Sequence, residues 1–176
     1  MKHDDHVGLI RAGVEGAGRR WLELGAGDGE FTLALADLLG ETGVIVAVDR
    51  DRWALEENAA RLASRFPATT LEMAIGDFTA GLPRGPFDGV LAANSLHFVA
   101  DPGPSLEAVR VALAPGGRLV LVEYDADQGN PYVPHPISVA RWAVLASSAG
   151  FEAPRLIHRV PSRFLGSIYG AVSTRV

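Results

Sequence analysis

Three glycines within five positions, Gly25, Gly27 and Gly29, follow directly after an apolar run in the segment RRWLELGAGDGEFTLALADLL, residues 19–39. Glycine permits a positive φ and lets a ligand approach the backbone closely, although it costs conformational entropy. The residues after the turn have helical spacing, so free N–H groups and the positive end of a helix dipole should face the same place. The cluster therefore predicts a ligand-binding turn.

Glu23 lies two residues before the first of these glycines. A carboxylate would repel a pyrophosphate, whereas it would attract a ligand that carries an ammonium or sulfonium group. A dinucleotide fingerprint would also need a glycine at position 30, where the chain has Glu30. The pattern thus argues against a nicotinamide dinucleotide. The simpler alternative is a tight strand-to-helix turn with Glu23 in solvent.

Two further acidic residues end apolar runs. Asp49 follows GVIVAV and is placed to accept hydrogen bonds from a ribose diol. An aspartate after a strand is also common as a helix N-cap, a role that Asp51 could fill instead. Asp77 in GDF (76–78) could accept from an adenine amino group while the next backbone N–H serves a ring nitrogen. Taken alone, this aspartate is equally consistent with a residue that stabilises a turn through a side-chain hydrogen bond to the backbone.

His97, in NSLHFV, is the candidate catalytic residue, because histidine exchanges protons near neutral pH. The alternative is a histidine that packs under a loop or fixes it. Tyr124, Tyr132 and His135 lie in or just before the segment DQGNPYVPHP and are candidate substrate-binding residues. The alternative for that segment is a loop stiffened by prolines. His3 and His6, with their acidic neighbours, are typical of a mobile terminus, and no metal site is expected.

The elements that must position these residues alternate along the chain. The patterns predict strands at 19–24, 43–49, 69–77, 86–94 and 118–125, and helices at 28–39, 50–66, 102–117 and 136–149. Trp53 is expected on the inner face of the second helix. Two closing strands, 151–160 and 163–172, are expected to form an antiparallel pair. This alternation predicts an α/β fold with a mostly parallel sheet, helices on both faces and ligands at the carboxyl ends of the strands.

The composition sets limits on the function. At 176 residues, with 48% hydrophobic and 21% charged residues, the chain is expected to form a single domain, 1–176. Its net charge of −5 and lack of a basic block argue against a nucleic-acid partner. Without cysteine there are no disulfides, thiolate metal sites or cysteine nucleophiles. No signal-peptide layout or membrane-length apolar run is visible, so a cytoplasmic protein that does not span a membrane is expected.

Five segments in order resemble the motifs of the small, single-domain class I S-adenosylmethionine-dependent methyltransferases (type 11/25-like). They are ELGAGDG, VAVDRD, IGDF, FDGVLAANSLHFV and ALAPGGRLVLVE, within roughly residues 20–125. The resemblance implies a Rossmann-like, seven-stranded, mostly parallel sheet with an antiparallel C-terminal strand pair. It also implies S-adenosyl-L-methionine as cofactor.

Carried over by position, the motifs assign the cofactor contacts. Glu23, Gly25, Ala26 and Gly27 would hold the methionine part, Asp49 the ribose, and Asp77 and Phe78 the adenine, while Asn94 would lie near the sulfonium. Arg50 departs from the family, which often has an apolar residue against the adenine. Its aliphatic stem could still pack there.

The implied function is transfer of a methyl group from S-adenosylmethionine to a small-molecule acceptor, leaving S-adenosylhomocysteine. The alternatives are a non-catalytic S-adenosylmethionine-binding or regulatory protein and, less favoured, a nicotinamide-dependent reductase. No membrane or nucleic-acid partner is expected. A second subunit, as in a homodimer, or the loop 124–136 must close the acceptor pocket, or the pocket stays open.

Overall fold

The computed structural model describes residues 1–176. Six helical segments lie along the chain: α1 (His3–Val14), α2 (Glu30–Leu39), α3 (Arg52–Arg65), the 3-10 helix η1 (Leu96–Phe98), α4 (Gly103–Ala112) and α5 (Val139–Ser148). Seven strands lie between and after them: β1 (Arg20–Leu24), β2 (Val44–Asp49), β3 (Thr70–Ile75), β4 (Phe87–Ala93), β5 (Leu113–Tyr124), β6 (Arg155–Pro161) and β7 (Ser167–Thr174).

All seven strands form one sheet in the order β3-β2-β1-β4-β5-β7-β6. Strands β1 to β5 pair in parallel, and β7 pairs antiparallel with both β5 and β6. This arrangement confirms the predicted fold class, including the antiparallel closing pair. The strand order reverses between β1 and β4, which is where open sheets of this type bind ligands.

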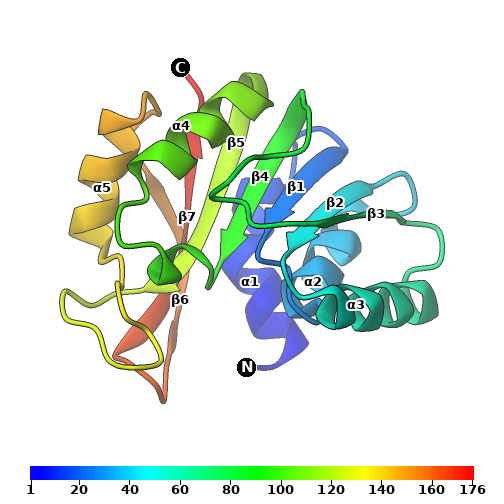
Figure 1. The fold of residues 1–176 in the computed structure, drawn as a ribbon, viewed down its shortest axis with the longest axis horizontal. Coiled ribbons are helices and arrows are strands. Elements are labelled where there is room, and N and C mark those ends of the chain that lie inside the picture. Colours follow the sequence, from blue (N-terminus) through cyan, green and yellow to red (C-terminus); the bar gives the residue numbers. More distant parts are fainter.

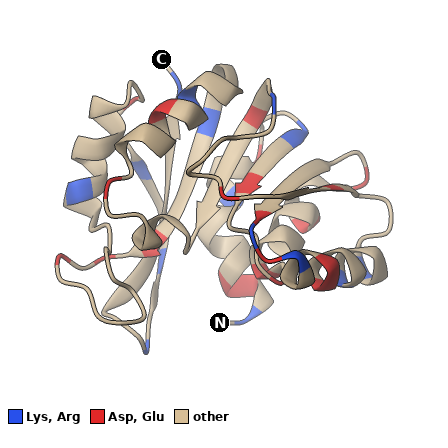
Figure 2. Cartoon of the chain, in the orientation of Figure 1, with Lys and Arg blue, Asp and Glu red and all other residues tan.

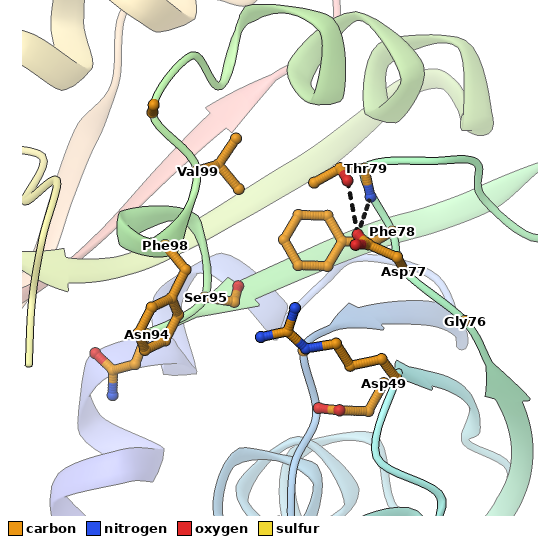
Figure 3. A pocket seen from close by; sticks show the side chains of 12 residues that line it. Asp49, Gly76, Asp77, Phe78, Thr79, Asn94, Ser95, Phe98 and Val99 are labelled. Atoms are coloured by element: carbon orange, nitrogen blue, oxygen red, sulfur yellow. Dashed lines mark hydrogen bonds between the residues drawn. The ribbon is translucent and has the colours of Figure 1, made fainter.

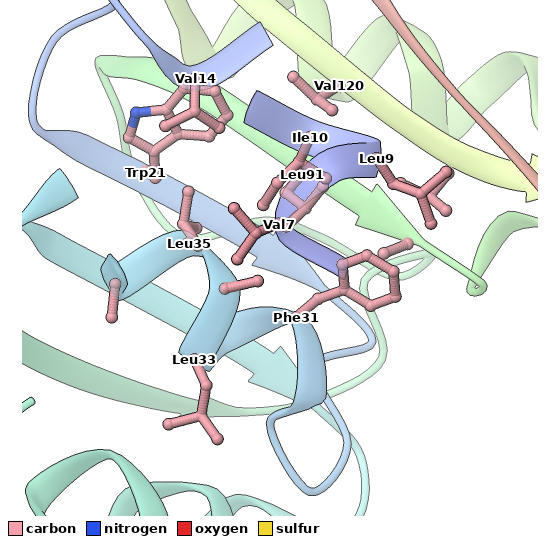
Figure 4. Close-up of a cluster of buried hydrophobic side chains, with 14 of the residues drawn as sticks. Val7, Leu9, Ile10, Val14, Trp21, Phe31, Leu33, Leu35, Leu91 and Val120 are labelled. Carbon is pink, nitrogen blue, oxygen red and sulfur yellow. The ribbon is translucent and has the colours of Figure 1, made fainter. Parts of the chain in front are cut away.

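Helices cover both faces of the sheet, with α1, α2 and α3 on one side and α4 and α5 on the other (Figure 1). Each face buries its own apolar cluster, as expected for parallel strands that are covered on both sides. The first cluster brings Val7 and Ile10 of α1 against Phe31 and Leu35 of α2, with Leu91 of β4 beneath them (Figure 4). The two clusters fix the strand ends that carry the polar residues.

The N-terminal segment is an amphipathic helix, so the expectation of a mobile terminus was wrong. Val7, Leu9, Ile10 and Val14 recur at helical spacing and are all buried. The helix packs against α2 and against strands β5, β6 and β7. The two acidic residues in its first turn suit the positive end of the helix dipole.

Several predicted boundaries and orientations differ from the structure. Helix α4 ends at Ala112, not at the Pro-Gly-Gly sequence, because Leu113 already pairs with Phe87 of β4. Helix α5 begins at Val139, after Ser138 caps it. The Trp53 side chain is 79% exposed, so its predicted inward orientation was wrong. None of the helices is both long and apolar enough to cross a bilayer.

Candidate functional site

A cavity of about 480 Å³ opens at the carboxyl ends of β1, β2, β3 and β4, at the point where the strand order reverses. Its volume lies in the range of small-molecule and cofactor sites. The close-up shows Asp49, Asp77 and Phe78 on one side, with Asn94 and Phe98 across from them (Figure 3). The lining residues are Gly25, Asp49, Arg50, Gly76, Asp77, Phe78, Thr79, Asn94, Ser95, Phe98, Val99 and Ala100.

The glycine turn between β1 and α2 is built on left-handed backbone. Gly25, Gly27 and Gly29 have φ values of 67°, 53° and 93°. A Cβ added to Gly25 would lie 2.8 Å from the Cβ of Ser95, so this glycine lets the turn approach the loop after β4. A Cβ added to Gly27 would meet nothing within 4 Å. The turn therefore leaves open space next to its second glycine.

Asp49 and Asp51 have separate roles after β2. The Asp49 carboxylate accepts the Gly27 N–H at 2.9 Å through Oδ2 and the Asp51 N–H at 2.9 Å through Oδ1. Asp49 thereby ties the glycine turn to the end of β2 and also lines the cavity. Asp51 is the N-cap of α3, accepting from the backbone N–H groups of Trp53 and Ala54. The capping role considered for Asp51 is confirmed.

Asp77 follows β3 and makes a local turn. Its Oδ1 accepts from the Thr79 backbone N–H at 2.9 Å and from the Thr79 hydroxyl at 2.7 Å. These two bonds hold the pKa of the Asp77 carboxyl below its ordinary value, the hydroxyl bond contributing most. Its Oδ2 makes no hydrogen bond within the chain, so one oxygen stays free at the cavity wall.

Asn94 and Ser95, directly after β4, present polar atoms without partners. Asn94 is the one non-glycine residue with a positive φ, 52°, and its side-chain Oδ1 is buried without a hydrogen bond. The buried Ser95 Oγ also lacks a partner. Both residues line the cavity. Because buried polar atoms are rarely left unpaired, these atoms fit a polar ligand held in this cavity.

Glu23 lies at the carboxyl end of β1 and is only 2% exposed. Its Oε2 accepts a hydrogen bond of 2.6 Å from the Thr32 hydroxyl of α2. Burial raises the pKa of this carboxyl to about 8, with the Thr32 bond acting against the rise and the charge of Asp49 adding to it. The simpler expectation of Glu23 in solvent was therefore wrong.

His97 lies in η1 and is 3% exposed. Its Nδ1 is 2.9 Å from Oε2 of Glu123, and its backbone N–H donates to Oε1 of the same carboxylate at 3.0 Å. Glu123 is fully buried near the end of β5 and also accepts the Tyr124 N–H. The imidazole ring packs between Phe98, at 4.3 Å, and Tyr124, at 5.5 Å between ring centroids. Its Nε2 makes no hydrogen bond within the chain.

Of the three candidate acceptor residues, Tyr124 and His135 contact His97, whereas Tyr132 lies apart from it. Tyr124 is buried against His97, and burial raises the pKa of its phenol. The His135 N–H donates to the His97 carbonyl at 3.0 Å, which ties the loop after β5 to η1. Tyr132 is 73% exposed and lies near Phe164 of the β6–β7 connection. None of the three lines the cavity.

Among the predicted cofactor residues, the cavity is lined by Gly25, Asp49, Arg50, Asp77, Phe78 and Asn94 but not by Glu23, Ala26 or Gly27. The cavity-lining residues that were not predicted from the sequence are Gly76, Thr79, Ser95 and residues 98–100, which begin at the last residue of η1. Ser95 directly follows Asn94 after strand β4, and this position could have suggested that it lines the cavity. Nothing in the pattern indicated that Phe98 would be turned toward the cavity. No group of three or more His, Cys, Asp or Glu side chains is arranged to hold a metal ion.

The sheet order and the cavity at its switch point define a Rossmann-like, class I methyltransferase fold. The family model of the methyltransferase domain matches residues 15–148. The chain therefore belongs to the methyltransferase domain family, and its cofactor is S-adenosylmethionine. The unpartnered atoms of Asn94 and Ser95, the open space at Gly27 and the carboxylate of Asp49 fit this cofactor.

Two curated proteins illustrate the similarity in sequence. The reducing polyketide synthase grgA of a Penicillium species is 31% identical over 156 residues, covering 76% of this chain and 6% of that protein. A ubiquinone/menaquinone biosynthesis C-methyltransferase UbiE of Ectopseudomonas mendocina is 30% identical over 115 residues, covering 65% of this chain and 44% of that protein. The chain thus spans less than half of these curated relatives.

A solved structure supports the same fold. An S-adenosylmethionine-dependent methyltransferase from Methanosarcina mazei superimposes with a TM-score of 0.74 at 16% identity. The superposition covers 95% of this chain and 97% of that one. At this identity the likeness concerns the fold.

Proposed function

We propose that the domain transfers a methyl group from S-adenosylmethionine to a small-molecule acceptor, with His97 as the base that receives the acceptor's proton. The observation that carries this proposal is the buried pair of His97 in η1 and Glu123 in β5, next to Phe98, which lines the cavity. A cofactor site alone would not need a histidine bound in this way. His97 does not itself line the cavity but is the neighbour of Phe98, which does, and we propose that its free Nε2 reaches an acceptor bound there.

Different cavity residues would contact different parts of the cofactor. Asp49 would accept from the ribose hydroxyls, because both carboxylate oxygens have further acceptor capacity beyond their backbone bonds. The free Oδ2 of Asp77 would accept from the adenine amino group, with Phe78 and the stem of Arg50 against the ring. Asn94 and Ser95 would satisfy polar atoms of the methionine part.

S-adenosylmethionine, when bound, supplies a methyl group on a sulfonium, which leaves as the neutral thioether of S-adenosylhomocysteine. Glu123 holds Nδ1 of His97, so the other ring nitrogen, Nε2, is the one that can accept the acceptor's proton. The electron pair released on the acceptor atom forms the new bond to the methyl carbon. The buried Glu123 carboxylate stabilises the resulting imidazolium.

A base suits an acceptor atom that must lose a proton, and we propose a carbon activated by a neighbouring carbonyl or phenol group. The similar UbiE protein is named a C-methyltransferase, and the similar grgA protein a reducing polyketide synthase. Tyr124 and His135, which contact the side chain and backbone of His97, would lie at the acceptor side, with Tyr132 farther out on the loop. A panel of phenols, 1,3-dicarbonyl compounds and simple alcohols would test this choice.

The experiment is to follow S-adenosylhomocysteine production on that panel for wild type, His97→Ala and Glu123→Gln. General-base assistance is typically worth about 100- to 10,000-fold, so kcat should fall by such a factor in His97→Ala while cofactor affinity is retained. If His97 only packs under the loop, the melting temperature and the affinity for both ligands should fall together. No turnover of any acceptor by wild type would favour a non-catalytic cofactor-binding protein.

We further propose that residues 1–176 act as one domain in the cytoplasm, on a small molecule and not on nucleic acid. The net charge of −5 supports the exclusion of nucleic acid. Lys and Arg are scattered among Asp and Glu over different elements (Figure 2). A homodimer that covers the acceptor side is the quaternary state we would look for. Light scattering after gel filtration, and fractionation of the native host's cells, would test these points.

A further inference from the structure

A chain of buried polar side chains runs beneath the glycine turn and joins three elements. The Asn58 amide of α3 donates to the Thr32 hydroxyl of α2 at 2.7 Å, and this hydroxyl donates to Oε2 of Glu23 in β1 at 2.6 Å. Asn58 and Thr32 are fully buried, and Glu23 nearly so. Burying polar side chains is energetically unfavourable unless they are hydrogen-bonded, so this buried network indicates a specific role.

With the Asn58 amide nitrogen facing Thr32, the two hydrogen bonds run in one direction, from Asn58 through Thr32 to Glu23. A threonine hydroxyl has one proton to donate. Because Thr32 Oγ1 accepts from the Asn58 amide, its own proton is left for Glu23 Oε2. That oxygen is therefore an acceptor, and a proton on the carboxyl group must be on Oε1. Oε1 makes no hydrogen bond within the chain.

The surroundings of Glu23 favour the neutral acid in the free protein. No cationic side chain pairs with Glu23, and the charged group that acts on it is Asp49 of β2, which is also acidic. Its neighbours across the sheet are Ala47 and Leu91, which are apolar. Glu30, at the start of α2, is engaged in its own ion pairs. An ionised carboxylate buried with one hydrogen bond and no counter-charge is strongly disfavoured.

We propose that Glu23 carries a proton in the free protein and releases it when the cofactor binds, with Thr32 and Asn58 as positioning residues that keep the proton on Oε1. The inference rests on the family's cofactor and not on the transfer reaction or on His97. Glu23 does not itself line the cavity, but Gly25, two residues later, does, and the ammonium of the zwitterionic methionine part would sit near the turn that Gly25 begins. A cation placed there favours the carboxylate over the acid.

The step is a simple acid dissociation. The O–H bond at Oε1 breaks, its electron pair stays on the carboxylate, and the proton passes to the buffer. A carboxyl group whose pKa is near 8 when free is mostly protonated at neutral pH. Binding should therefore release a fraction of a proton that approaches one per cofactor.

The test is calorimetric titration with S-adenosylhomocysteine in buffers of different ionisation enthalpy, between about pH 6 and about pH 9. The dependence of the binding heat on buffer gives the number of protons released. Wild type should release more protons at neutral pH than Glu23→Gln, by nearly one, and the difference should vanish at the alkaline end. Equal proton release by the two proteins at every pH would overturn the proposal. If both proteins bind S-adenosylhomocysteine but release equal numbers of protons, the proposal for Glu23 fails while the cofactor assignment stands.

The positioning residues are tested with a matched pair at one site. Thr32→Val removes the donor to Oε2, so the pH range of proton release should shift upward, because the hydrogen bond that favours the carboxylate is lost. Thr32→Ser keeps the hydroxyl and should retain the wild-type range. Identical ranges for these two variants would exclude a role for the hydroxyl. Should Glu23→Gln fail to fold, infrared spectroscopy of wild type must show the protonated-carboxyl band weakening on binding; an unchanged band would contradict the proposal.

Discussion

Asp49 and Asp51 stand two positions apart after β2, and their carboxylates have different partners. Asp49 lines the cavity, so Asp49→Ala should weaken cofactor binding by roughly 10- to 100-fold, the loss of a charge-assisted hydrogen bond of about 1.5–3 kcal/mol. Asp51 caps α3, so Asp51→Ala should instead cost about 1 kcal/mol of the free energy of unfolding. Titration calorimetry and urea denaturation of both variants would check this. Swapped effects would mean that the ribose contact is assigned to the wrong aspartate.

The buried Glu23 also predicts how stability depends on pH. Its pKa is raised to about 8 in the folded protein, so between its unfolded value and about pH 8 the folded state holds more protons than the unfolded state. This group's contribution to the free energy of unfolding should therefore decrease as pH rises through that range, and level off above it. Glu23→Gln should lack the decrease. Urea denaturation at several pH values would show it, and parallel curves for the two proteins would contradict the raised pKa.

At the scale of single residues, the sequence predicted the cavity-lining acids well and the buried groups less well. Asp49 and Asp77 are placed by strand ends, which the alternating pattern reveals. The partner of His97 is Glu123, 26 positions away, and only the pairing of β4 with β5 brings the two together. For Ser95 the one available signal was its position directly after Asn94, because its contact with Gly25 arises only in the folded chain.

The glycine turn is the element that shapes the cavity, and Gly27→Val should abolish cofactor binding by filling the open space beside it. A side chain at φ 53° also strains the backbone by roughly 1–2 kcal/mol. Gly116 is a matched control, since it has a φ of 72° and an equally open Cβ position but lies in β5, away from the turn that Gly25 begins at the cavity. Both variants should lose similar stability, and only Gly27→Val should lose affinity. Retained affinity would show that the turn serves the backbone alone.

Helix α1 is predicted to be an integral part of the fold. Ile10 is fully buried between this helix and the sheet, so Ile10→Ala should cost about 2–5 kcal/mol of the free energy of unfolding. Val111→Ala, on the exposed face of α4, is the control and should change it by less than about 0.5 kcal/mol. Urea denaturation would measure both. Equal small effects would mean that α1 does not pack as described.

The elements missed from the sequence share a physical reason. In α1, the polar residues His3 to His6 precede a short apolar spacing whose burial depends on packing against α2 and the sheet. In α4, the Pro-Gly-Gly sequence looked like a helix end, although the strand pairing of Leu113 with Phe87 ends the helix earlier. Trp53 was expected to be inward because it is large and apolar, yet it lies in the first turn of α3 on the solvent side. Tertiary contacts decided each of these cases.

At the scale of the whole molecule, the fold class could be predicted from the alternation of strands and helices and from the order of the five motifs, whereas the strand order was not predicted. The residues that cover the acceptor side could not be predicted from the sequence. Tyr132 and Phe164 come together only through the loop after β5 and the β6–β7 connection. Both side chains are largely exposed. The acceptor itself must therefore be found by experiment.

We expect the cavity at the β1/β4 switch point to bind S-adenosylmethionine. Titration calorimetry of the purified protein with S-adenosylmethionine, supported by a thermal-shift measurement, tests this binding. We expect a dissociation constant in the micromolar range, about −8 kcal/mol, and a raised melting temperature. Absence of both binding heat and thermal shift at millimolar cofactor would contradict the account.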